Sequence, residues 1–174
     1  MQGKIGVDKE EAQHLFDHLD WPGAVEELSQ AVKFLREGGA NKVGAIGFCM
    51  GGALALAAAQ KAGVDAAVPF YGLPQEGLCQ PQNIKVPVQL HFGRLDQFKG
   101  FSDPDSATAF ADKVNAAGGK AEVFIYEDCG HGFLNEGDEG KEKREHMGFP
   151  QPSAESQQLA WQRLLDFFDK NLKQ

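Results

Sequence analysis

Apolar residues follow two patterns along this chain of 174 residues: short continuous runs, and longer stretches in which they recur every three or four positions. Four runs have the length of a buried strand and end close to a glycine or a polar turn. These predicted strands cover Val43 to Phe48, Ala66 to Tyr71, Val86 to Phe92 and Ala121 to Tyr126. We expect no strand of convincing length before Val43.

The stretches with helical spacing predict helices before, between and after the strands. They cover Asp8 to His18, the segment that Asp20 caps and Gly38-Gly39 ends, Ala53 to Lys61, Ser106 to Ala117, and Ser153 to Leu172. Apolar faces are expected from Val25, Leu28, Val32 and Leu35 in the second helix and from Leu159, Leu164, Leu165, Phe168 and Leu172 in the last. The charged segment from Asn135 to Pro152 is expected to be a solvated loop.

Strands that alternate with helices predict a mainly parallel sheet covered on both faces. We therefore expect a single three-layer α/β domain over residues 1–174. Functional sites in such sheets lie outside the carboxyl ends of the strands. The residues that follow each predicted strand are accordingly the first candidates for chemistry.

Charge and cysteine content narrow the class of protein. The formal net charge of −8 argues against nucleic acid or an anionic membrane surface as a partner. No apolar run approaches the roughly 20 residues that span a bilayer, and Met1 to Val7 contains no signal-peptide core. Three scattered cysteines do not form a disulfide framework. A reducing, cytoplasmic setting is expected.

The most informative motif is Gly47-Phe48-Cys49-Met50-Gly51-Gly52, which lies between an apolar run and an alanine-rich helical segment. It has the G-x-C-x-G pattern of a nucleophile elbow, a sharp strand-to-helix turn with the nucleophile at its apex. We expect a Cβ atom on either flanking glycine, Gly47 or Gly51, to collide with nearby backbone. The helix start beside Cys49 would favour its thiolate.

Two other strand ends carry groups that complete such a site. Asp96 follows the third predicted strand, and His131 lies between glycines after the fourth. The order nucleophile, acid, histidine is that of the α/β-hydrolase triad. Cys49 would attack a carbonyl, His131 would transfer the proton and Asp96 would orient the imidazole. The backbone N–H of Met50 is the expected oxyanion donor.

Each of these residues also has a purely structural interpretation. A cysteine after an apolar strand can be a small buried hydrophobe, an aspartate a turn former and a histidine an ordinary loop residue. Their joint occurrence in this order favours catalysis. A zinc site from Cys49, Cys129 and His131 is disfavoured, because Cys129-x-His131 lacks a common zinc spacing. Cys79 and Cys129 are expected to be structural thiols.

Several motifs together resemble the dienelactone hydrolase (carboxymethylenebutenolidase) family of the α/β-hydrolase superfamily. They are the cysteine elbow, Gly93-Arg94-Leu95-Asp96, Gly130-His131-Gly132-Phe133, Leu19 to Val25, and Phe70-Tyr71-Gly72. The resemblance covers essentially the whole chain. It implies hydrolysis of a small-molecule lactone or ester through an acyl-cysteine, with no metal or organic cofactor. It also suggests that Tyr71 lines the substrate pocket.

The chain departs from the family in two respects. Family members that act on dienelactone carry an arginine four residues after the histidine, and Asn135 occupies that position here. Losing a guanidinium weakens the case for a substrate with a carboxylate, so Asn135 is kept as a substrate-binding candidate of unknown preference. Family members also have a substantial segment, including strands, before the point where this chain begins.

The second departure has consequences for the sheet and for activity. Without a preceding strand, the strand that ends at Phe48 would be an edge. We therefore expect either a portion of a longer protein or a short form that pairs this edge with another chain, including a homo-oligomer. One oxyanion donor would also be missing, which favours a non-catalytic role, and two alternatives to the hydrolase stay open. They are a thioesterase or acyltransferase on the same triad, and a non-catalytic interaction module.

Overall fold

The computed structural model describes residues 9–173, so the predicted helix residue Asp8 lies outside the described residues. The helices and strands are α1 (Lys9–Asp17), α2 (Trp21–Glu37), β1 (Gly44–Phe48), α3 (Met50–Lys61), β2 (Ala66–Phe70), the short 3₁₀ helix η1 (Pro81–Asn83), β3 (Pro87–Gly93), α4 (Pro104–Ala116), β4 (Lys120–Tyr126), α5 (Gly137–His146) and α6 (Ala154–Leu172). All four predicted strands are present with shifts of one residue at most.

The sheet is parallel, as predicted, and its spatial order β1-β2-β3-β4 follows the chain. Strand β1 pairs with β2 alone among the described residues, so it forms an edge of the sheet. On its paired side, the Val43 carbonyl accepts from Asp65 N–H and Cys49 N–H donates to the Phe70 carbonyl. By alternation, the backbone groups of Gly44, Ile46 and Phe48 point to the free side.

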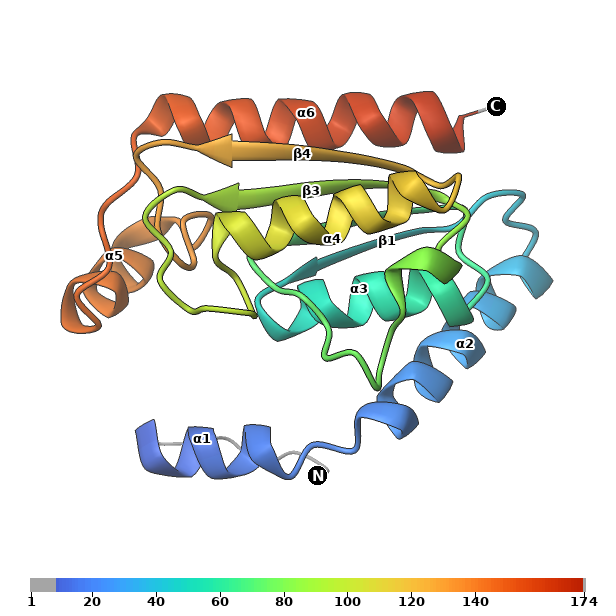
Figure 1. Cartoon of the computed structure of the whole chain (residues 1–174), viewed down its shortest axis with the longest axis horizontal. Coiled ribbons are helices and arrows are strands. Elements are labelled where there is room, and N and C mark those ends of the chain that lie inside the picture. Colours follow the sequence, from blue (N-terminus) through green and yellow to red (C-terminus); the bar gives the residue numbers. More distant parts are fainter. Residues whose placement is uncertain (1–8, 174) are drawn as a thin grey trace.

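Helices cover both faces of this sheet (Figure 1). Helices α3 and α4 pack on one face and α6 packs on the other against β2 and β3. Connections between parallel strands are right-handed. Because the strands follow one another across the sheet in chain order, the helices that connect them, α3 and α4, lie on the same face. The carboxyl ends of the strands point to one end of the molecule, where α5 lies (Figure 1). The predicted three-layer α/β architecture is confirmed.

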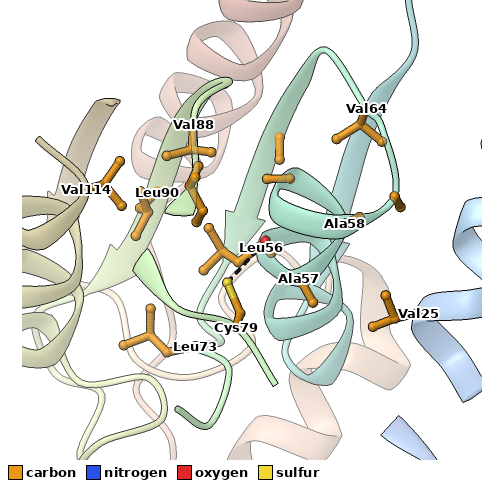
Figure 2. Close-up of a cluster of buried hydrophobic side chains, with 14 of the residues drawn as sticks. Val25, Leu56, Ala57, Ala58, Val64, Leu73, Cys79, Val88, Leu90 and Val114 are labelled. Atoms are coloured by element: carbon orange, nitrogen blue, oxygen red, sulfur yellow. Dashed lines mark hydrogen bonds between the residues drawn. The ribbon is translucent and has the colours of Figure 1, made fainter. Parts of the chain in front are cut away.

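The larger hydrophobic core lies between the sheet and helices α2, α3 and α4. Figure 2 shows part of it, with Leu56 of α3 between Val88 and Leu90 of β3 and the loop residue Cys79. The Cys79 thiol is buried and donates to the Leu56 carbonyl at 3.5 Å. Five alanines among the twelve residues of α3 let this helix approach the strands closely.

The second core, on the α6 face, contains a series of buried polar side chains linked by hydrogen bonds. His91 of β3 is fully buried and lies between Phe70 and Tyr126, with which its ring stacks. Tyr126 Oη donates to His91 Nδ1 at 2.8 Å, and His91 Nε2–H donates to Gln89 Oε1 at 2.9 Å. We assign this tautomer because an amide oxygen accepts only.

Several apolar side chains predicted to be buried are exposed instead. Ile46 and Phe48 of β1 are 42% and 37% exposed, because α6 packs mainly on β2 and β3 and reaches the edge strand most closely at Gly44. Leu159 and Leu165 lie on the outer side of α6, while Leu164 is buried. Leu35 near the end of α2 is exposed too. The predicted apolar faces are therefore narrower than helical spacing suggested.

The segment predicted as a solvated loop contains helix α5. Its sequence, Gly137-Asp-Glu-Gly-Lys-Glu-Lys-Arg-Glu-His146, has no large apolar residue, so apolar periodicity gave no signal. Within residues 9–173, none of the helices combines the length and the apolar character needed to cross a bilayer.

Candidate active site

Cys49 occupies a sharp turn between β1 and α3. Its φ of 53° lies in a region that non-glycine residues rarely adopt, and the fold holds it there. A Cβ on Gly47 would collide with the Gly51 carbonyl, as the sequence predicted. The prediction for Gly51 was wrong, since a Cβ there meets nothing within 4 Å. The second close approach falls on Gly52, where a Cβ would lie 2.7 Å from the Phe70 carbonyl oxygen.

Asp96 lies on the turn that follows β3 and is 4% exposed. Its carboxylate oxygen Oδ1 accepts from the backbone N–H of Phe98 at 3.2 Å and from the hydroxyl of Ser102 at 2.9 Å. The turn packs closely against the loop after β4, where a Cβ on Gly93 would collide with the Cys129 carbonyl. This contact brings the strand ends that carry Asp96 and His131 together.

His131 bridges the other two predicted residues. Its Nε2 lies 3.1 Å from Cys49 Sγ, and its Nδ1 lies 2.8 Å from Asp96 Oδ2. Residues 49, 96 and 131 come from the ends of β1, β3 and β4, so the parallel sheet is what gathers them. An imidazole placed between a thiol and a carboxylate can accept the thiol proton while the carboxylate fixes its tautomer.

Ser102 belongs to the same cluster and was missed by the sequence analysis. Its fully buried hydroxyl donates to Asp96 Oδ1 and lies 3.1 Å from His131 Nδ1. A serine in a loop before a helix carries no local signal of such a role, because its usual interpretation is a turn or cap residue. The hydroxyl donates to the carboxylate oxygen that His131 does not contact, and so limits rotation of the Asp96 side chain.

The electrostatic environment favours a charged imidazole. Burial alone would lower the pKa of His131, but hydrogen bonds with the Asp96 carboxylate and the Cys49 sulfur outweigh it and raise the pKa to about 9. A histidinium that persists above neutral pH is the natural counter-ion for a thiolate. The arrangement can therefore hold a preformed thiolate–imidazolium pair.

Met50 is the first residue of α3, directly after Cys49. The first N–H groups of an α-helix have no acceptor within the helix. The Met50 N–H is thus available to an oxyanion beside the sulfur, as the sequence predicted, and this role stays a prediction.

Tyr71 directly follows β2 and adopts a positive φ of 36°. Its ring lies edge-on to the His131 ring at 5.2 Å, and the residue is 1% exposed. Among the described residues its hydroxyl forms no hydrogen bond of full geometry, although the Leu134 backbone lies near it, and burial raises its pKa well above the ordinary value. An unpartnered buried hydroxyl next to the histidine is compatible with the expected substrate-binding role of Tyr71.

Asn135 lies on the surface four residues beyond His131. Its backbone N–H donates to the Gly132 carbonyl at 2.9 Å, which closes a turn directly after the histidine. The side-chain amide nitrogen would lie 3.1 Å from a Cβ on Gly132. A contact of Asn135 with substrate stays a prediction.

Aromatic rings surround the imidazole on its other sides. Phe98 and Phe149 lie edge-on to it at 5.1 and 5.8 Å, and Phe101 lies 6.3 Å away. Phe98 is 46% exposed, so this apolar wall reaches the surface. The site thus combines a polar triad with an apolar entrance.

The two remaining thiols differ from Cys49. Cys79 and Cys129 are buried, and burial raises the pKa of each to about 12, so both are protonated at neutral pH. All three cysteines are free thiols. Within the described part of the chain, no cluster of three or more histidine, cysteine or acidic side chains is arranged to hold a metal ion.

Comparisons with known proteins give one consistent result. The Dienelactone hydrolase family matches residues 2–172. Protein usf of Aquifex pyrophilus is 36% identical over 181 residues, which cover 98% of this chain and 72% of that protein. The carboxymethylenebutenolidase of Pseudomonas putida is 32% identical over 135 residues, which cover 76% of this chain and 56% of the enzyme. The chain thus spans about half the length of several curated relatives.

Solved structures share the fold. An α/β-hydrolase from a Medee basin deep-sea metagenome library superposes with a TM-score of 0.66 and 16% identity, covering 86% of this chain and 65% of that one. Esterase 2 of Thermogutta terrifontis gives a TM-score of 0.64 and 18% identity, covering 84% and 62%. The predicted α/β-hydrolase-like fold is confirmed.

Proposed function

The chain belongs to the dienelactone hydrolase family, and from that premise we propose that it hydrolyses a small-molecule lactone or ester through Cys49, His131 and Asp96. One observation carries the proposal. A single imidazole lies 3.1 Å from the Cys49 sulfur and 2.8 Å from the Asp96 carboxylate. Both distances are within the reach expected of a nucleophile, its base and the group that orients the base.

In the acylation step, the Cys49 thiolate attacks the carbonyl carbon and the carbonyl oxygen becomes an oxyanion. The Met50 N–H stabilises that charge, since it is the residue after the nucleophile. Collapse of the tetrahedral intermediate breaks the carbon–oxygen bond of the ester. The leaving oxygen takes the proton from His131 Nε2, and an acyl-cysteine remains. In a lactone, the leaving hydroxyl stays tethered to the acyl group.

In the deacylation step, the neutral His131 takes a proton from water, and the hydroxide attacks the thioester carbon. The carbon–sulfur bond breaks, the carboxylic acid is released, and the thiolate–imidazolium pair is restored. Asp96 keeps Nδ1–H directed at its own oxygen throughout, so Nε2 faces the sulfur.

The substrate is proposed to be uncharged near the site. The apolar wall of Phe98 and Phe149 and the exposed amide of Asn135 offer no guanidinium to a carboxylate. Tyr71 is proposed to line the pocket through its unpartnered hydroxyl. No metal or organic cofactor enters the proposed reaction.

Turnover of a chromogenic ester and intact-mass detection of the acyl-enzyme test the proposal together. We expect Cys49→Ala to abolish both turnover and the adduct, while the matched thiol control Cys79→Ala retains them. Unchanged turnover in Cys49→Ala would show that the mechanism is wrong. Product transferred to an added alcohol or thiol rather than to water would identify an acyltransferase. A folded protein without any Cys49 adduct would identify an interaction module.

The setting of the protein is also a proposal. Three free thiols suit a reducing compartment, so we propose the cytoplasm. The unpaired β1 edge suits contact with a second chain, and a homo-oligomer is the proposed form.

A further inference from the structure

Arg144 of α5 is a buried cation that the proposed mechanism does not use. The residue is 4% exposed, although arginine is seldom buried without a charged partner. Within residues 9–173 its guanidinium forms no ion pair, and its hydrogen bonds go to neutral oxygens. Keeping a charge in such a place is costly, which points to a specific role for its geometry.

The guanidinium joins the α5 segment (residues 137–151) to the loop of the catalytic histidine. Its Nη1 donates to the carbonyl of Asn135 and, at 3.4 Å, to that of Gly132, the residue directly after His131. On the other side, Nε and Nη2 both donate to Gln151 Oε1, at 3.1 and 2.9 Å. A planar fork of donors suits this bridge, which an ammonium could not span.

The residue before the histidine meets the same segment. A Cβ on Gly130 would lie 2.6 Å from the Pro150 ring, which shows how closely this ring approaches the Gly130 backbone. Gly140 of α5 presses on the same turn, since a Cβ there would collide with the Asn135 carbonyl. Both chain neighbours of His131 are therefore in contact with the α5 segment.

The α5 segment also reaches the imidazole ring itself. The Phe149 N–H donates to the Arg144 carbonyl at 2.8 Å, and the Phe149 ring lies edge-on to His131 at 5.8 Å. Phe98 packs on Phe149 at 5.7 Å and encloses the imidazole from the opposite loop. One arginine thus ties together the backbone beside His131 and the ring that packs against it.

We propose that Arg144 is a positioning residue for His131, which it holds at the Cys49 sulfur through Gly132, Asn135 and the α5 segment. The inference rests on the proposed function for its meaning in catalysis. Misplacing a catalytic group by about 1 Å can cost on the order of 10²-fold in rate. Arg144 itself has no contact with the substrate in the proposed mechanism, so we expect the main effect in kcat.

Arg144→Met tests this inference through two readouts. We expect kcat for a chromogenic ester to fall roughly 10- to 100-fold with KM changed less than about threefold. We also expect slower alkylation of Cys49 by iodoacetamide at pH 6–7, with the midpoint of its pH dependence shifted upward. The reason is that a displaced imidazolium no longer favours the thiolate. Arg144→Lys keeps the charge but not the fork, and should resemble Arg144→Met.

Two further variants provide the controls. Lys143→Met changes the exposed neighbour that pairs with Glu139, and should leave both readouts unchanged. Gln151 lies outside α5, and its side-chain oxygen accepts two hydrogen bonds from Arg144. Gln151→Met removes this acceptor, so kcat and the alkylation of Cys49 should change in the same direction as in Arg144→Met. If Arg144→Met does not fold, the result for Gln151→Met decides whether Arg144 positions His131.

The inference is overturned if Arg144→Met or Gln151→Met lowers the melting temperature while kcat and the midpoint of the alkylation profile stay equal to those of the wild type. That result would make Arg144 a structural residue only. Alkylation needs no ester, so it tests Arg144 even if the ester assay fails. Failure of the proposed function is recognised separately, by turnover that survives Cys49→Ala.

Discussion

Individual residues at the elbow are constrained by backbone atoms rather than by side chains. Cys49 holds a positive φ, and the space that its turn needs comes from Gly47, Gly52 and Gly72. The motif predicted that glycines would flank the cysteine for steric reasons, and this was right for Gly47 and wrong for Gly51. A sequence pattern shows where glycine occurs, whereas only the path of neighbouring backbone shows which glycine is needed.

Gly47→Ala and Gly51→Ala form a matched pair that tests this distinction. Because a Cβ at position 47 collides with the Gly51 carbonyl, we expect Gly47→Ala to lose several kcal/mol of stability or fail to fold. Gly51 lies in the first turn of α3 with open space around it, so alanine should be neutral or stabilise by up to about 1 kcal/mol. Urea unfolding measures both, and equal losses would contradict the geometry.

The charge state of His131 should be visible in the pH dependence of the reaction. Because the pKa of His131 is raised to about 9, the imidazolium that the proposed mechanism uses to protonate the leaving group is lost as pH rises through that value. We therefore expect kcat/KM to fall on the alkaline side with a midpoint near 9.

The same profile measured on Asp96→Asn isolates the carboxylate. Removing the charge that raises the pKa of His131 should move the alkaline limb toward the ordinary histidine value of about 6.5 and lower kcat by a factor on the order of 10²–10⁴. An alkaline limb that stays near 9 in this variant would show that Asp96 does not set the charge of His131.

Single elements differ in how well the sequence predicted them. Strands β2 and β3 are dominated by apolar side chains, and their runs were unmistakable. Helix α5 was missed because it is held by Arg144 and by the close approach of Gly140, and neither contact follows an apolar period. Ser102 and Arg144 escaped detection for the same reason. Their partners lie far along the chain or on backbone carbonyls, where no motif records them.

The pairing of β3 with β4 places His91 where it cannot easily be charged. Burial, followed by the nearby Arg163 guanidinium of α6, lowers the pKa of His91 to about 3. The polar groups facing the ring are Tyr126 Oη of β4 and Gln89 Oε1 of β3, which bind its two nitrogens. A histidine with a lowered pKa binds its proton in the unfolded chain first, so stability falls as pH decreases from about 6.5 toward 3.

Urea unfolding at two pH values tests this effect. Between pH 7 and 4.5 the wild type should lose about 2–3 kcal/mol through His91, since one pKa unit corresponds to about 1.4 kcal/mol. His91→Gln keeps a polar side chain that does not titrate, so its own loss over the same range should be clearly smaller. Equal losses in the two proteins would assign the acid sensitivity to other groups.

At the scale of the whole molecule, strand β1 forms an edge of the sheet within residues 9–173. Strand β1 contains no charged residue and no proline, the usual devices that keep an edge from pairing. Ile46 and Phe48 are exposed beside it, and Phe48 lies 6.1 Å from Trp161 of α6. The sequence analysis expected this edge, and β1 is an edge within residues 9–173, but it did not predict that apolar side chains would remain exposed there.

Light scattering on Ile46→Lys tests whether this edge binds a second copy. We expect the wild type to show a mass above the 18.9 kDa of one chain, and Ile46→Lys to shift it toward that value, because a lysine at the edge opposes strand pairing. Phe34→Lys on α2 is the matched control, since it removes an apolar side chain that is 75% exposed on another element. A monodisperse wild-type monomer would contradict the homo-oligomer.

The strand order β1-β2-β3-β4 has a consequence for how the protein is made. Each strand pairs with the one synthesised just before it, so the sheet can grow strand by strand as the chain leaves the ribosome. Of the three proposed catalytic residues, Cys49 is synthesised first, Asp96 follows and His131 is last. Under the proposed mechanism, a nascent chain therefore carries its nucleophile well before the base that activates it, and the site forms only after β4 has paired with β3.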